Sequence, residues 1–152
     1  MDKRDLEQLL SDVADGAVAP AVALTRIQTA PTADLGFAQL DLSRGVRQGA
    51  GEVVYGAGKT AEQIAAIIEA LRDAGQERIL VTRLDAEKAA RTAELLGNGI
   101  DLGYVPDAQL ALAGGKPSPT GNGRIVVACA GTSDLPVAEE AALTAEFYGN
   151  EV

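Results

Sequence analysis

The chain has 152 residues, of which 47% are hydrophobic, 3% aromatic and 23% charged, a balance typical of a globular protein with one domain, or one small domain and part of a second. Its formal net charge of −9 would repel phosphate backbones and anionic membranes, so non-specific binding to nucleic acid or lipid is excluded as its main activity. No apolar run reaches the roughly 18 residues of a membrane helix, and the charged start is unlike a signal peptide, so we expect a cytoplasmic protein.

The N-terminal segment has the pattern of a helical hairpin. Between Lys3 and Asp15, apolar side chains recur at the spacing of one helical face, and Gly16 then ends the helix. The recurring side chains are Leu6, Leu9, Leu10 and Val13. A shorter helix is expected from Pro20 to Ile27, because proline is tolerated in the first turn.

The next segment, up to Lys59, alternates between loops and short strands. A proline and a glycine among polar residues predict a loop over residues 29–36, and the alternation after it predicts a strand from Phe37 to Leu42. A basic turn punctuated by glycine over 41–49, a strand over 52–55 and a glycine-rich loop over 56–59 follow.

Two capped helices and three strands are expected next. Thr60 and Gln63 have the spacing of a capping box, and an apolar face continues this helix to Gly75. Asp85 is expected to cap a second helix that ends at Leu96. The expected strands cover residues 78–84, 102–105 and 109–113. The order strand, helix, strand, helix, strand predicts a small α/β unit.

The remaining segment begins with a linker. Four glycines and two prolines within residues 114–123 offer little to bury. Residues 124–130 resemble a parallel strand covered on both faces, and a helix is expected from Leu135 to Tyr148. One strand and one helix cannot form such a sheet, so we expect this unit to be disordered, exchanged onto another chain, or added to the first unit's sheet.

The turn between that strand and helix has the residues of an anion cradle. Gly131 lets the backbone approach a ligand closely, Thr132 and Ser133 carry hydroxyl donors, and the helix start supplies unpaired N–H groups. The spacing matches neither a P-loop nor a dinucleotide fingerprint. The alternative is that Ser133 or Asp134 simply caps the helix.

Several stretches resemble the LarB family. Residues 130–141 are similar to the first ligand loop of carboxylases related to the purine-pathway enzyme PurE, in the variant that LarB carries. Residues 52–63 and 80–83, together with the helical hairpin, resemble the domain that precedes the PurE-like core in LarB. PurE itself lacks such a domain, and this favours LarB over PurE.

The resemblance implies an α/β fold in three parts. An N-terminal helical hairpin and a small α/β domain would occupy residues 1–113, and residues 114–123 would be the linker. Residues 124–152 would then form the first βα unit of a PurE-like core, which has a flavodoxin-like parallel sheet.

The same resemblance implies an enzyme that carboxylates the pyridinium ring of nicotinic acid adenine dinucleotide, with CO2 or bicarbonate as co-substrate. It also hydrolyses the phosphoanhydride, which releases AMP and a biscarboxylated mononucleotide, the first intermediate of a nickel-pincer cofactor. The cysteine that adds to the ring and the carboxylate that removes the ring proton are expected beyond Val152, so this chain alone is expected to be inactive. The resemblance to PurE-like cores implies a homo-oligomer, specifically an octamer. Whether Mg²⁺ accompanies the phosphates stays open.

Substrate-binding residues are expected in two groups. The turn formed by Gly131, Thr132, Ser133 and Asp134 is the first group. Cations on glycine-rich turns, Arg44, Arg47 and Lys59, are the second, since they can hold phosphates and a carboxylate, and Asp41 could orient one of the arginines. The alternative for these cations is that they are solvated loop charges.

Three further side chains have structural interpretations. The chain has no histidine and a single cysteine, so it can form neither an internal disulfide nor a transition-metal cluster. Cys129 lies in the apolar strand and is expected to be buried and unreactive. Glu139 and Glu140 are adjacent on the last helix, so they point in different directions, one towards a ligand and one towards solvent.

Two other functions remain open. The chain could be a nucleotide-binding or regulatory module without chemistry, as the name circadian phase modifier given to some homologues suggests. It could also be a PurE-type aminoimidazole ribonucleotide carboxylase, which the upstream domain disfavours.

Overall fold

The computed structural model describes residues 3–28, 32–42, 44, 51–97 and 99–152. The elements in chain order are α1 (Lys3–Ala14), α2 (Pro20–Gln28), β1 (Thr32–Asp34), β2 (Gln39–Asp41), β3 (Val53–Tyr55), α4 (Ala61–Asp73), β4 (Ile79–Thr82), α5 (Ala86–Leu95), β5 (Leu102–Val105), β6 (Leu110–Ala113), the 3₁₀ turn η1 (Thr132–Asp134) and α6 (Leu135–Phe147). The mixed α/β class is confirmed, and in the described ranges no helix is long and apolar enough to span a bilayer.

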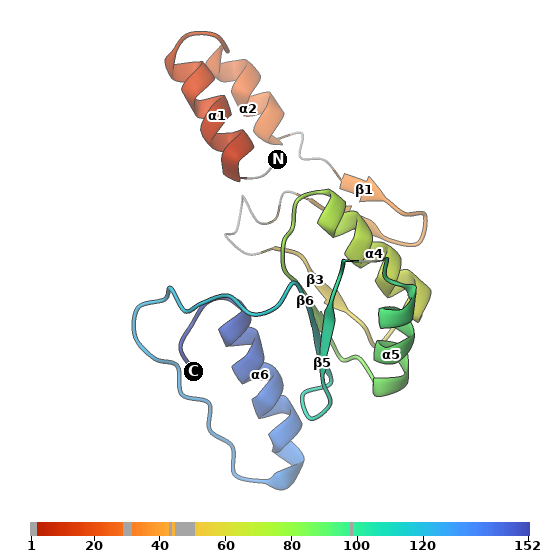
Figure 1. The fold of residues 1–152 in the computed structure, drawn as a ribbon. Coiled ribbons are helices and arrows are strands. Elements are labelled where there is room, and N and C mark those ends of the chain that lie inside the picture. Colours follow the sequence, from red (N-terminus) through yellow and green to blue (C-terminus); the bar gives the residue numbers. More distant parts are fainter. Residues whose placement is uncertain (1–2, 29–31, 43, 45–50, 98) are drawn as a thin grey trace.

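The predicted helical hairpin forms. Helices α1 and α2 pack on each other, with Leu9 and Ala23 buried between them. Gly16 has a φ of 75°, a left-handed conformation that glycine adopts without strain at a helix end. The hairpin lies at one end of the molecule, towards the top of Figure 1.

The predicted loop over residues 29–36 is wrong in its second half, because β1 begins at Thr32 and pairs antiparallel with β2. The turn between the two strands explains the hairpin. The side chain of Asp34 accepts a hydrogen bond from the Gly36 N–H at 2.8 Å, and Gly36 has a φ of 79°. Asp and Gly thus mark a tight turn here rather than a long loop. Residues 29–31 lie outside the described residues.

The central sheet has four strands in the order β3-β4-β6-β5. Strands β3 and β4 are parallel, while β6 is antiparallel to both of its neighbours. The six strands and helices that the sequence predicts from β3 to β6 are all present, and the crossover helix α4 accounts for the parallel pair.

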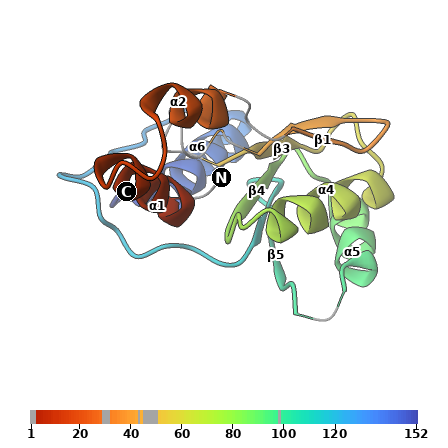
Figure 2. The same cartoon turned by 90° about the horizontal axis from the view of Figure 1, so that it is seen from above.

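Helices cover both faces of this sheet, because its central strands alternate buried side chains between two hydrophobic clusters. Ile79 and Val81 of β4 face α4 and α5, whereas Leu80 faces α6. On the α6 side, Leu143 and Phe147 complete the second cluster with Leu110 and Leu112. In Figure 2 the sheet lies between α4 and α5 on one side and α6 on the other. Covered faces on both sides explain why β6 and the first three residues of β4 are continuously apolar.

The predicted strand over residues 124–130 does not form. An isolated parallel bridge joins Arg124 to Glu151, and the Ile125 N–H donates to the Glu151 carbonyl at 2.8 Å. Beyond that bridge the segment has no neighbouring strand in the described part of the chain, so it remains extended and exposed, with Val126 at 81%. The following helix, α6, instead packs on the central four-stranded sheet.

Candidate functional site

A small depression, here called the β2–β3 depression, gathers part of the predicted cationic group. Its volume is about 180 Å³. The residues that line it are Ala38, Gln39, Leu40, Asp41, Glu52, Val53, Val54, Lys59 and Ile67. It therefore places Asp41 and Lys59, 18 positions apart in the sequence, around one hollow at the edge strand of the sheet.

Arg44 lies next to this depression because it is held by one of the lining residues. Its Nη1 donates to Glu52 Oε1 at 2.9 Å. The Arg44 side chain is 41% exposed and that of Glu52 is 20% exposed, so the guanidinium is fixed from the protein side and remains accessible from solvent. Glu52 therefore orients Arg44. That Asp41 orients one of the arginines stays a prediction. Arg47 lies outside the described residues.

The loop between β3 and α4 is fixed by two lysines. Lys59 Nζ donates to the Tyr55 carbonyl at 3.1 Å, and Lys88 Nζ, from α5, donates to the Gly56 carbonyl at 3.2 Å. A side chain at Gly56 would bring its Cβ to 3.0 Å from the Thr82 carbonyl oxygen, so the loop fits tightly against the end of β4. The sequence did not single out Lys88, because only the packing of α5 on α4 brings it to this loop.

The α5 start adds a negative charge beside these cations. Asp85 accepts a hydrogen bond from the Lys88 backbone N–H at 2.8 Å, and its Oδ2 lies 3.3 Å from Lys88 Nζ. The backbone hydrogen bond lowers the pKa of Asp85 below its ordinary value, desolvation opposes this, and the Lys88 ammonium adds to the lowering. Asp85 thus stays ionised and holds Lys88 near the loop.

The second predicted group, the turn at Gly131–Asp134, forms a 3₁₀ turn that leads into α6. No side-chain capping hydrogen bond forms at the described start of either element, so the alternative interpretation, in which Ser133 or Asp134 simply caps the helix, is not supported. Thr132, Ser133 and Asp134 are exposed. The two hydroxyl residues are therefore exposed at the start of α6, where the Asp134 N–H donates to the Gly131 carbonyl and the Leu135 N–H to the Thr132 carbonyl.

The two predicted groups belong to opposite faces of the sheet. Leu40, beside Asp41, packs in the cluster on the α4 and α5 face, whereas α6 covers the other face. Within the described residues of one chain, the turn at Gly131–Asp134 and the β2–β3 depression do not form one site.

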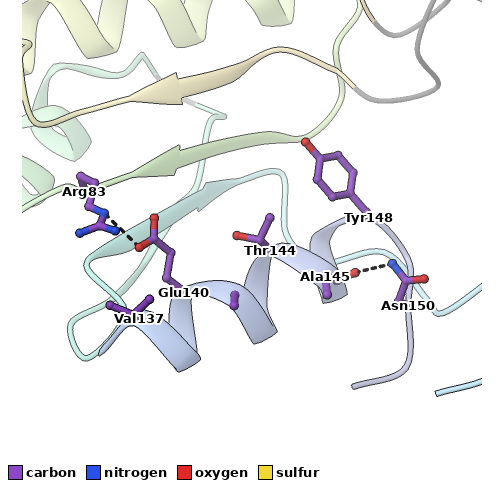
Figure 3. Close-up of a pocket in the computed structure, with 8 residues that line it drawn as sticks. Arg83, Val137, Glu140, Thr144, Ala145, Tyr148 and Asn150 are labelled. Atoms are coloured by element: carbon purple, nitrogen blue, oxygen red, sulfur yellow. Dashed lines mark hydrogen bonds and ion pairs between the residues drawn. The ribbon is translucent and has the colours of Figure 1, made fainter. Parts of the chain in front are cut away.

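A larger open groove runs between α6 and the end of β4, and we call it the α6 groove (Figure 3). It is lined by Arg83, Val137, Glu140, Ala141, Thr144, Ala145, Tyr148 and Asn150. Arg83 Nε lies 3.0 Å from Glu140 Oε2, and Figure 3 shows this pair at one end of the groove, with Tyr148 and Asn150 at the other. Arg83 has a φ of 54°, an uncommon conformation for a residue with a side chain.

The adjacent carboxylates of α6 diverge as the sequence predicts. Glu140 is partly buried against Arg83, and Glu139 is exposed. The prediction for Cys129 is wrong, because its side chain is exposed. No strand lies against residues 125–130 in the described chain, so nothing covers the thiol. Among the described residues, no group of three or more acidic or cysteine side chains could hold a metal ion.

Comparison with known protein families places most of the α/β unit in one of them. A family model, the LarB/PurE-like N-terminal domain, matches residues 32–113, more than half of the chain. The matched range runs from β1 to the end of β6 and includes the whole β2–β3 depression, Arg44 and the lysine-fixed loop. The hairpin α1–α2 and the turn at Gly131–Asp134 lie outside it. No curated protein matches the chain.

Proposed function

Because the chain belongs to the LarB/PurE-like family of carboxylase-type enzymes, we propose that it serves the carboxylation of the pyridinium ring of nicotinic acid adenine dinucleotide. CO2 or bicarbonate is the co-substrate, and hydrolysis of the phosphoanhydride releases AMP. The product is the first intermediate of nickel-pincer cofactor biosynthesis. One observation carries this proposal: the family match covers Lys59, which lines the β2–β3 depression, and Arg44, which is paired with the lining residue Glu52.

These cations suit an anionic dinucleotide. The substrate carries two phosphates and a carboxylate, and a guanidinium can bind either group with paired hydrogen bonds. In a chain with a net charge of −9, an anion needs a local group of cations to offset the general repulsion. The matched domain offers Lys59 beside the depression, with Arg44 and Lys88 nearby in ion pairs with Glu52 and Asp85 that an anionic substrate would share.

The turn at Gly131–Asp134 is proposed as a second contact for the same substrate. Its exposed hydroxyls, at the positive end of a helix dipole, suit a phosphate or sugar. In this proposal residues 124–152 begin the PurE-like core after the linker at 114–123. Since the turn and the β2–β3 depression lie on opposite faces of one sheet, neighbouring copies in a homo-oligomer would supply them to one substrate.

The test follows AMP release from nicotinic acid adenine dinucleotide and bicarbonate, with the carboxylated product identified by its mass. The 152-residue chain and the enzyme that carries it together with a whole PurE-like core are assayed side by side. We expect turnover by the enzyme with the core. Carboxylation of aminoimidazole ribonucleotide instead, or dinucleotide binding without turnover, would replace the proposed reaction.

Single substitutions test the site. Arg44→Met and Lys59→Met are each expected to raise the KM by at least about tenfold, because each removes a charge-assisted hydrogen bond to the substrate. Arg26→Met, an exposed cation on α2, is the matched control and should leave the KM unchanged. Wild-type kinetics in both site variants would mean that Arg44 and Lys59 are solvated loop charges and do not bind the substrate.

A further inference from the structure

The side chain of Gln76 pairs with the backbone of Glu52 as a neighbouring strand would. Its Oε1 accepts from the Glu52 N–H at 3.0 Å, and its Nε2 donates to the Glu52 carbonyl at 2.9 Å. The same Nε2 donates to the Arg78 carbonyl at 2.9 Å. Gln76 lies in the turn between α4 and β4, so it ties the start of β3 to the start of β4 just before their parallel ladder begins.

The neighbouring residue leaves room for this contact because it has no side chain. A Cβ at Gly51 would lie 2.6 Å from Gln76 Cδ and 2.7 Å from Nε2, closer than real Cβ atoms come to their neighbours. A larger residue at this position would push the amide away from Glu52. The close fit indicates that the amide is held in one place.

Glu52 links Gln76 to the β2–β3 depression, because it is bonded to Gln76 and also lines the depression. Its backbone is held on both polar groups by Gln76, and its carboxylate holds Arg44 at 2.9 Å. A long guanidinium side chain loses several rotatable bonds when it binds an anion, and fixing it beforehand reduces that entropic cost. A chain of hydrogen bonds therefore runs from Gln76 through Glu52 to the guanidinium.

We propose that Gln76 is a positioning residue, which fixes Glu52 so that its carboxylate presents Arg44 to an anionic group of the substrate. This inference rests on the proposed function, because it assumes that Arg44 binds the dinucleotide. Gln76 itself touches no substrate atom in this arrangement.

A double-mutant cycle tests the proposal in the enzyme that carries this chain with a PurE-like core. The dissociation constant of nicotinic acid adenine dinucleotide is measured by calorimetry for Gln76→Ala, Arg44→Met and the double variant. Gln76→Ala is expected to weaken binding about fivefold, roughly the value of one hydrogen bond. In the Arg44→Met background the same substitution is expected to have no effect, because Gln76 acts through Arg44.

The outcomes separate the two proposals. Two results overturn the positioning role alone. In the first, Gln76→Ala weakens binding equally in the wild-type and Arg44→Met backgrounds. In the second, Arg44→Met weakens binding but Gln76→Ala in the wild type does not. Wild-type affinity in Arg44→Met overturns the proposed function of Arg44 and this inference with it. If Gln76→Ala does not fold, Gln76→Glu keeps the acceptor for the Glu52 N–H, and the same comparison decides. Gln8→Ala, on exposed α1, is the control and should bind normally.

Discussion

Thr92 is a buried polar side chain whose hydroxyl has no hydrogen-bond partner in the described structure. It lies on α5 at 0% exposure. A buried hydroxyl without a partner loses its hydration and gains nothing in return, which costs about 1–3 kcal/mol. The unsatisfied Thr92 hydroxyl therefore lowers the stability of the fold.

Thr92→Val should raise the free energy of unfolding by about 1 kcal/mol, because it replaces the unsatisfied hydroxyl with a methyl group of similar size. Urea unfolding followed by circular dichroism measures this change. The control is Thr92→Ser, which keeps the hydroxyl and removes the methyl, and it should lower the stability. A less stable valine variant would mean that the hydroxyl has a partner.

Replacing Ser133 distinguishes between two roles of this residue, a helix cap and a ligand contact. The start of α6 has no side-chain capping hydrogen bond, so Ser133→Ala should leave the thermal unfolding midpoint within about 1 °C of the wild type. If the turn binds a phosphate or sugar as proposed, the same substitution should weaken dinucleotide binding in calorimetry. Unchanged affinity would remove the turn from the proposed site, and a loss of stability would show that Ser133 is a cap after all.

At the scale of elements, helix starts are the best determined parts of the fold. Thr60 accepts a hydrogen bond from the Gln63 N–H at 3.3 Å, and Gln63 accepts from the Thr60 N–H at 3.0 Å. This capping box was predicted from two residues three positions apart, and it is confirmed. Such a cap satisfies donors that the helix itself leaves unpaired, so its signal is local.

The cap of α5 makes stability depend on pH. The pKa of Asp85 is lowered in the folded state, chiefly by the Lys88 backbone N–H, so the charged form stabilises the fold at neutral pH. This contribution is present above the unfolded pKa and is lost as the pH falls through the lower, folded pKa. Asp85→Asn keeps the capping oxygen without the charge, and it is therefore the matched comparison.

We expect wild type to have a higher thermal midpoint than Asp85→Asn at neutral pH, and the difference to shrink as the pH falls below about 4. Calorimetric scans across this range measure the gap between the two proteins. A gap that stays constant with pH would show that the Asp85 charge contributes nothing to stability.

At the scale of the whole molecule, α6 determines how the sheet is covered. Phe147 is 7% exposed and packs with Leu80 and Leu112 in the second hydrophobic cluster. The other sides of α6 remain apolar and exposed, with Leu135, Val137 and Tyr148 between 43% and 53% exposure. A helix that is apolar on several sides is typically covered on more than one of them.

Phe147→Ala should therefore lower the free energy of unfolding by about 3 kcal/mol, since it removes a large buried ring from the cluster beneath the sheet. Chemical denaturation provides the measurement. Val126→Ala, in the exposed segment, is the control and should change stability by less than about 0.5 kcal/mol. A negligible effect of Phe147→Ala would mean that α6 does not cover this face in solution.

Much of the fold could be predicted from the sequence because its signals are local. The periodic leucines of α1, the caps at Thr60 and Asp85, and the strand β4 all depend on residues within one element. The candidate site could be predicted only in part. Lys59 stood out as a cation on a glycine-rich turn, whereas Glu52, Gln76 and Lys88 have no local pattern that marks them.

The sequence by itself therefore determined the family, the α/β class and the helices, since periodicity and capping are properties of neighbouring residues. Tertiary structure decided the rest. The segment at 124–130 has the composition of a strand but forms only the isolated bridge at Arg124, because a strand exists only beside another strand. In the same way, Gln76 meets Glu52 across 24 positions, and Lys88 meets Gly56 across 32. Contacts of this kind depend on how α4 and α5 pack on the sheet, and no spacing within the sequence records that packing.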